Sequence, residues 1–165
     1  MMKLARFLRR RGRAVAAVEF AITAPVLLAF LGGVVDFGLA YYDQSRVGAG
    51  VGAGAEYALL NYSTVLASPA TAQSTTIPDL VESASGLTGM TVTVTGLSPT
   101  VCYCVSSGPP PSVTAQASCT ATCSNGAPAG YYAFITGSYT YHAMLPGYSH
   151  LVNPTITETA TVQIK

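Results

Sequence analysis

An uncharged apolar stretch near the N-terminus constrains this chain more than any other feature. Residues 20–35 (FAITAPVLLAFLGGVV) contain no charged side chain and are bounded by Glu19 and Asp36. As a helix this stretch would span about 24 Å, slightly less than the roughly 30 Å of a bilayer's hydrocarbon core. Extension through residues 15–18 and 37–42 makes the helix long enough and places both acids near the membrane edges. The sequence therefore predicts a single-pass membrane helix.

Basic side chains are concentrated ahead of this stretch. Six of the eight Lys and Arg residues precede it, at Lys3, Arg6, Arg9, Arg10, Arg11 and Arg13. A basic flank marks the cytoplasmic side of a membrane helix, so we expect residues 1–13 in the cytoplasm and residues 43–165 outside it. The chain is 50% hydrophobic and only 9% charged, which is typical of membrane insertion or assembly. No basic surface for nucleic-acid binding follows the apolar stretch.

A cleavable secretory signal is the alternative interpretation of the same segment. It would combine the basic leader and the apolar stretch with a small-residue cleavage site at Gly38-Leu39-Ala40. The apolar stretch is long for a signal, and Glu19 and Asp36 are unusual neighbours for one. A retained membrane anchor is therefore the preferred interpretation.

Composition divides the chain into four segments. They are a basic cytoplasmic leader (1–13), a transmembrane and extended helix (14–62), a linker with a short helix (63–89) and a β-rich domain outside the cytoplasm (90–165). The linker covers residues 63–77, which are rich in Ser, Thr and Ala. The short helix is predicted from Pro78, an early-position proline, to the stop signal Gly86.

Two features mark the long helix. Pro25 removes a backbone hydrogen bond and predicts a local kink. Gly48/Gly52 and Gly50/Gly54 form two small-xxx-small pairs, which indicate either close helix packing or a flexible joint. Their spacing loosely fits a nucleotide-binding glycine loop, but no strand precedes them, so phosphate binding is not expected.

Beyond residue 90 the hydrophobic pattern changes to the period of two that is typical of strands. Five candidate strands follow, at residues 90–96, 101–105, 113–122, 131–143 and 154–165. In the last one, threonines alternate with apolar residues, and Glu158 interrupts the apolar face. We expect a small antiparallel sheet with one buried side. The predicted fold class is α+β, a long N-terminal transmembrane helix followed by a small disulfide-stapled antiparallel β-sheet domain.

Four cysteines lie in the β-rich domain, at Cys102, Cys104, Cys119 and Cys123. An even number of cysteines in a small, loop-rich, exported domain favours two disulfides over a zinc site, whose usual ligand spacings fit poorly. Three connectivities are open; if the second and third strands pair as a hairpin, Cys102–Cys123 and Cys104–Cys119 would nest. Each disulfide would contribute about 3 kcal/mol for a loop of roughly fifteen residues.

The sequence shows no arrangement of residues that points to catalysis. No Ser/His/acid constellation, no pair of catalytic carboxylates and no phosphate-binding loop stands out. We therefore expect neither enzyme activity nor a metal or cofactor.

Residues 12–28 (GRAVAAVEFAITAPVLL), followed by Asp36, Gly38 and residues 55–58 (AEYA), resemble the TadE-like family. Its members are pilin-like proteins of the tight-adherence (Flp, type IVb) pilus systems of bacteria. The resemblance rests on the basic leader, the motif A-V-E-F-A, a proline six residues after the glutamate and a later acidic residue, and it covers about the first third of the chain. The cysteine pattern and the Thr-rich last strand give the distal half a looser likeness to the same family.

This resemblance implies a structural or assembly component of a tight-adherence pilus or secretion system. Such a protein would be anchored in the bacterial inner membrane, with its C-terminal domain in the periplasm. Its expected partners are membrane lipid, pilins or other pilus-assembly membrane proteins, and a prepilin peptidase that trims the leader. The residues to which the resemblance gives roles in assembly or processing are Gly12, Ala14, Val15, Glu19, Phe20, Pro25 and Asp36.

Glu19 has the central role in what the resemblance implies. In relatives a glutamate is the fifth residue of the mature chain and can neutralise the N-terminal amine of a neighbouring subunit, which would offset the cost of a carboxylate at the membrane edge. Cleavage after Gly12 would make Glu19 the seventh residue, whereas the fifth place requires cleavage between Ala14 and Val15. The alternative function is an unprocessed, membrane-tethered binding or adhesion module.

Overall fold

The computed structural model describes residues 2–106, 112–144 and 154–164, with residues 2–14 described by their helical backbone alone. Lys165, at the end of the last predicted strand, lies outside this part. The helical elements are α1 (Met2–Leu60), α2 (Tyr62–Ala67), α3 (Pro69–Thr71), the π-helix η1 (Ala72–Thr76) and α4 (Ile77–Ser85). The strands are β1 (Thr91–Thr95), β2 (Cys102–Val105), β3 (Val113–Gln116), β4 (Tyr132–Thr140) and β5 (Thr155–Gln163). The predicted α+β class is confirmed.

The chain divides into two compact units. The first consists of Met1–Ala40 and Ala143–Val152, and the second of Tyr41–His142 and Asn153–Lys165. Helix α1 belongs to both, because its apolar stretch lies in the first unit and its C-terminal third in the second.

In the first unit α1 is a long apolar helix. From Val15 onward its length and hydropathy are sufficient to cross a membrane. The helix continues without a break through Pro25, and the predicted kink there stays a prediction. It also continues through Gly38, Leu39 and Ala40, the cleavage site of the alternative signal interpretation.

In the second unit residues 62–85 are helical apart from a bend at Ser68, so the prediction of a linker over residues 63–77 is wrong. Helices α2 and α3 and the π-helix η1 occupy this stretch. Val65, Ala72 and Ile77 are buried there, and packing of such spaced apolar side chains overrides the modest helix propensity of Ser and Thr. The predicted short helix is confirmed: α4 ends at Ser85 and is followed by Gly86, whose φ of 63° is the left-handed conformation that glycine adopts readily.

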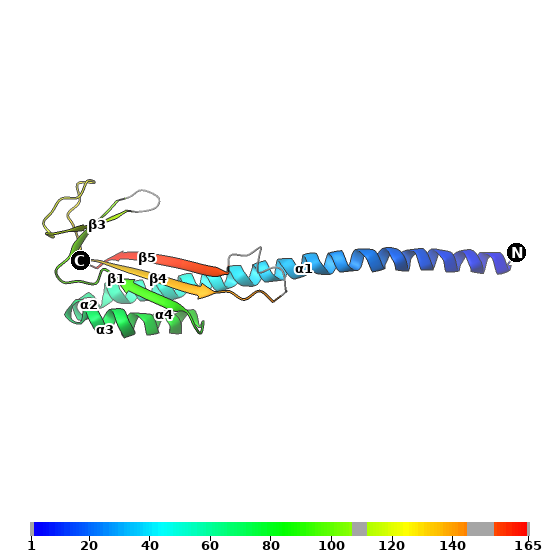
Figure 1. Ribbon diagram of the computed structural model, residues 1–165, viewed down its shortest axis with the longest axis horizontal. Coiled ribbons are helices and arrows are strands. Elements are labelled where there is room, and N and C mark those ends of the chain that lie inside the picture. The colour runs from blue at the N-terminus through cyan, green and yellow to red at the C-terminus, as the bar shows by residue number, and fades with distance from the viewer. Residues whose placement is uncertain (1, 107–111, 145–153, 165) are drawn as a thin grey trace. The chain divides into compact units, whose positions relative to one another are not determined.

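The strands form two antiparallel sheets, where the sequence predicted one. Strand β4 is the centre of a three-stranded sheet of order β1-β4-β5, and β2 pairs with β3 in the other sheet. In the three-stranded sheet Val94 pairs with Ile135, which pairs with Ala160, so apolar residues share one face. The C-terminal end of α1 and helix α4 run along this sheet (Figure 1).

Two glycines of α1 allow α4 to pack closely against it. A Cβ atom at Gly50 would lie 2.6 Å from the backbone oxygen of Val81, and one at Gly54 would lie 2.6 Å from Val81 Cγ2. Cβ atoms at Gly48 and Gly52 would meet no atom within 4 Å. The predicted close helix packing is therefore confirmed for the pair Gly50/Gly54, and its partner is a helix of the same chain.

The same part of α1 packs on the inner face of the three-stranded sheet. A Cβ atom at Gly137 would lie 2.8 Å from Val51 Cγ2, and Ile135 is fully buried. Burial of a side chain of this size contributes about 1.5–3 kcal/mol. Glu158, which interrupts the apolar face, accepts a hydrogen bond at Oε1 from Nε2 of Gln44 on α1 (2.8 Å).

Arg46 on α1 forms hydrogen bonds with the C-terminal end of α4. Its Nε donates a hydrogen bond to the carbonyl of Ser85 (2.9 Å), and its Nη2 donates to the carbonyl of Gly86. Carbonyls at the end of a helix lack intrahelical partners, and the helix dipole makes them favourable neighbours for a cation. Asp43 lies 3.6 Å from Nη1 of Arg46, and the ring of Tyr42 lies 5.7 Å from its guanidinium carbon.

The four cysteines form two disulfides, as the sequence predicts, but the nested connectivity is wrong. Cys102 pairs with Cys119 and Cys104 pairs with Cys123, with Cα–Cα distances of 5.2 and 5.5 Å. Both disulfides join β2 to the segment that follows β3. All four thiols are used in this way, which leaves none for the alternative zinc site.

The connectivity differs from the nested arrangement because β3 is shorter than predicted. The strand predicted to end at residue 122 ends at Gln116, which pairs with Cys102. A turn follows, in which the amide of Ala121 donates to the carbonyl of Ser118 (3.1 Å). The segment with the second pair of cysteines therefore does not continue the pairing of β3 with β2. The first cysteine of β2 bonds to the first cysteine of this segment, and the second to the second.

Candidate functional site

The residues that the sequence marks for assembly or processing all lie on α1 within the first unit. Gly12 and Ala14 belong to the part described by its backbone. Val15 and Phe20 are 58% and 71% exposed, and the side chain of Glu19 is also exposed. The structure therefore places the side chains of Val15, Glu19, Phe20 and Pro25 on the exposed surface of one helix, whereas Asp36 is buried.

Large apolar side chains remain exposed along the whole apolar stretch of α1. They are at least 38% exposed at Val18, Ile22, Val26, Leu27, Leu28, Phe30, Leu31, Val34, Val35, Phe37 and Leu39. A soluble protein rarely exposes an apolar surface of this extent, and such surfaces mark contacts with membranes or other proteins. The exposed helix is consistent with the predicted membrane anchor.

Glu19 lies near the N-terminal end of this exposed apolar surface, directly after Val18. Its backbone carbonyl accepts a hydrogen bond from Oγ1 of Thr23 (2.9 Å), one turn further along the helix. Among the side chains that the structure describes, from residue 15 onward, none pairs with the Glu19 carboxylate. Exposed Pro25 lies two residues after Thr23, and its lack of an N–H group leaves the carbonyl of Ala21 without its usual intrahelical donor.

Asp36, at the other boundary, is buried, with only 1% of its surface exposed. Its Oδ1 accepts a hydrogen bond from the backbone amide of Met144 (2.8 Å), which belongs to the same compact unit. A buried carboxylate is costly unless it is hydrogen-bonded, and bonds from backbone amides to a charged acceptor are strong. Asp36 therefore holds a residue from the connection after β4 against α1.

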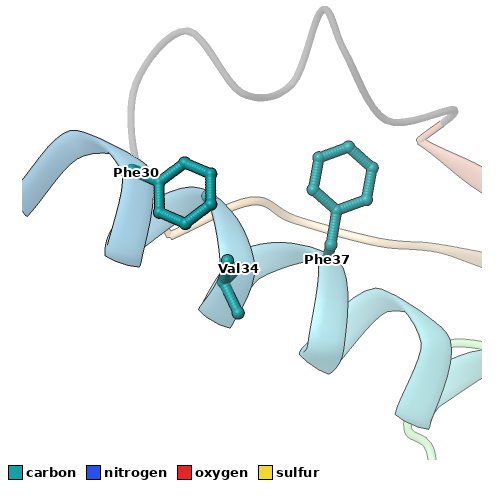
Figure 2. A pocket seen from close by; sticks show the side chains of 4 residues that line it. Phe30, Val34 and Phe37 are labelled. Atoms are coloured by element: carbon teal, nitrogen blue, oxygen red, sulfur yellow. The ribbon is translucent and has the colours of Figure 1, made fainter. Parts of the chain in front are cut away.

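A hollow on α1 was not predicted from the sequence. It has a volume of about 380 Å³ and is lined by Phe30, Gly33, Val34 and Phe37. Figure 2 shows the rings of Phe30 and Phe37 standing out from the helix, with Val34 between them along the chain. Gly33 has no side chain to fill the space between the rings. The helical spacing of Phe30, Val34 and Phe37 is the signal that could have revealed this feature.

Comparison with known proteins identifies the segment in which these residues lie. Residues 14–56 match the family described as TadE-like protein. This segment is TadE-like. The match confirms the resemblance seen in the sequence and includes Glu19, Pro25 and Asp36. Comparison of the chain with curated proteins and with solved structures gave no significant match.

The TadE-like segment coincides with most of α1. It begins at the N-terminal end of the exposed apolar surface and ends at residue 56, within the part of α1 that packs against α4 and the sheet. The match does not extend to the strands, so the looser likeness of the distal half stays a prediction. The family evidence therefore concerns the helix.

Proposed function

We propose that this protein is a pilin-like structural or assembly component of a tight-adherence pilus or secretion system. Helix α1 anchors it in the bacterial inner membrane, and the part from residue 43 onward lies in the periplasm. The observation that carries this proposal is that the TadE-like residues 14–56 lie in one continuous helix with exposed apolar side chains. An exposed apolar helix needs lipid or other apolar helices around it.

Glu19 supports a role in assembly rather than anchoring alone. An acidic residue at the centre of a membrane helix costs roughly 2.5–3.5 kcal/mol, and less near the interface. A helix that served only as a membrane anchor would not need a charged residue at this position. A basic group or N-terminal amine from another subunit would offset the cost, because opposite charges attract strongly in an apolar environment.

The hollow at Gly33 supports contact with the helices of partner proteins. Its lining side chains carry no polar group, and the flanking rings of Phe30 and Phe37 are 69% and 51% exposed. Helices in membranes associate through close packing of complementary shapes. A protruding side chain of a pilin or of another assembly helix would fill this space between the two rings.

Complementation of a deletion strain with Glu19→Gln tests the proposal. The substitution removes the charge and keeps the shape, so membrane insertion should be unchanged or slightly easier. Fibre formation should be lost, because the neutral side chain cannot pair with a charged group of another subunit. Membrane abundance and surface fibres are scored separately.

Glu82→Gln is the matched control, since Glu82 is an exposed glutamate of the second unit outside the TadE-like residues 14–56, and glutamine keeps the side-chain oxygen that accepts a hydrogen bond from the amide of Gly89. This control should support normal fibres. Normal fibres with Glu19→Gln at normal membrane abundance would exclude the assembly role of Glu19.

A further inference from the structure

The outer face of the three-stranded sheet consists mainly of hydroxyl-bearing side chains. It is formed by the odd-numbered residues of β1 and β5 and the even-numbered residues of β4, and we call it the threonine face. Nine of its thirteen residues are threonine. Helices α1 and α4 pack on the opposite face, which contains the apolar core.

The hydroxyl groups of the threonine face are arranged in rows across the strands. Thr93, Thr136 and Thr159 lie side by side on β1, β4 and β5. The hydroxyls of Thr136 and Thr159 are 3.1 Å apart, and those of Ser138 and Thr157, in the next row, are 2.9 Å apart. A hydroxyl has one donor and two acceptor positions, so one such bond does not use all the hydrogen-bonding positions of either hydroxyl. Within a row, neighbouring strands are about 4.8 Å apart, and successive rows are about 6.8 Å apart because they are two residues apart along the strands.

Aromatic rings lie at one end of the threonine face. The ring of Phe134 stacks with that of Tyr132 at 6.2 Å and meets the ring of Tyr103 edge-on at 5.3 Å. Gly96, with a φ of 85°, leaves room for Phe134, because a Cβ there would lie 2.5 Å from Phe134 Cδ2. All three rings are half-buried and present part of their surface to solvent.

The threonine face carries no Asp, Glu, Lys or Arg. In the second unit, the charged side chains that the structure describes lie on the helices or on the inner face, at Asp43, Arg46, Glu56, Asp79, Glu82 and Glu158. Protein surfaces usually mix both signs of charge at a high frequency. An uncharged face is suited to a partner that is itself uncharged.

We propose that the threonine face binds a neutral polysaccharide. A sugar chain presents repeated hydroxyls, which match donors and acceptors held in rows, and its C–H surfaces stack on aromatic rings. A nucleic acid would require basic side chains. A protein partner fits less well, because the centres of protein interfaces are apolar and Ser and Thr are under-represented among their energetically important residues. Rigid strands also limit the entropy lost on binding.

Binding of the full-length protein in detergent micelles to cellulose, starch and chitin tests this proposal, with alginate as the anionic comparison. We expect saturable binding to at least one neutral polymer and weaker binding to alginate. The double variant Thr136→Val/Thr159→Val keeps the shape and the strand propensity and removes two hydroxyls that are each other's partners. It should reduce the affinity about tenfold, which corresponds to the loss of one or two hydrogen bonds to the ligand.

The matched control is Thr88→Val/Thr122→Val, which removes two exposed threonine hydroxyls outside the threonine face. This control should bind like the unaltered protein, and circular dichroism should show the same fold for all three proteins. No binding to any of the neutral polymers, or equal loss in both double variants, would overturn the proposal. The unaltered protein could instead form dimers and bind no polysaccharide. If only Thr136→Val/Thr159→Val abolished these dimers, the threonine face would be assigned to a second copy of the chain. The result of this binding assay does not depend on the assembly role proposed for Glu19.

Discussion

Gly50 and Gly52 lie two residues apart on α1 in environments that differ in available space. A Cβ atom at Gly50 would lie 2.6 Å from a backbone oxygen of α4 and 2.9 Å from Ser85 Cβ. A Cβ atom at Gly52 would meet nothing within 4 Å. The sequence shows the same small-xxx-small pattern for both residues, so it could not tell which of them contacts a neighbour. That distinction depends on the helix that packs against α1.

This difference predicts opposite effects of the same substitution. Gly50→Ala should destabilise the second unit by about 1–3 kcal/mol, because the backbone oxygen of Val81 cannot move aside as a flexible side chain would. Gly52→Ala should stabilise it by about 0.5–1 kcal/mol, since alanine loses less conformational entropy in a helix than glycine. Thermal unfolding followed by circular dichroism measures both. A higher Tm for Gly50→Ala than for Gly52→Ala would contradict the packing of α1 on α4.

Asp36 shows another limit of residue-level prediction. Its position at the end of the apolar stretch, and the family resemblance, marked it as a functional residue. Its hydrogen-bond partner Met144 lies 108 residues further along the chain. No local pattern encodes a contact over such a separation, because it depends on how the chain returns after β4.

Among the secondary-structure elements, those with strong periodicity were predictable. The alternation of β1, β4 and β5 and the apolar stretch of α1 were recognised, as was α4 with its proline and terminal glycine. Residues 63–77 were not, since their helical state depends on burial of a few spaced residues such as Val65 and Ile77. The sequence leaves three disulfide connectivities open for a similar reason, because the turn after Gln116 decides between them.

The two disulfides should differ in their contribution to stability. Cys102 is fully buried, whereas Cys104 is only half-buried. The loops that the two disulfides close, 17 and 19 residues, are nearly equal, so each should contribute about 3 kcal/mol through chain entropy. The double variant Cys102→Ala/Cys119→Ala also loses buried contacts and should therefore unfold at a lower temperature than Cys104→Ala/Cys123→Ala. Equal unfolding temperatures, measured without reductant, would contradict this order.

In the whole molecule, different parts of one chain have different proposed tasks. The exposed apolar part of α1 is proposed to hold the protein in the membrane and to contact other subunits through Glu19 and the hollow at Gly33. The second unit has its own core and two disulfides, and it is proposed to lie outside the cytoplasm. Both tasks require that the apolar helix stays attached to the folded domain.

The mass and N-terminal sequence of the protein purified from membranes test this requirement most directly. We expect a chain that begins ahead of Glu19, at Val15 or Arg13 if a prepilin peptidase trims the leader, or at Met1 or Met2 if it does not. In each of these cases the apolar helix remains part of the protein. A mature chain that begins near Tyr41 would show that the helix is a cleaved export signal, and would contradict both the membrane anchor and the assembly role.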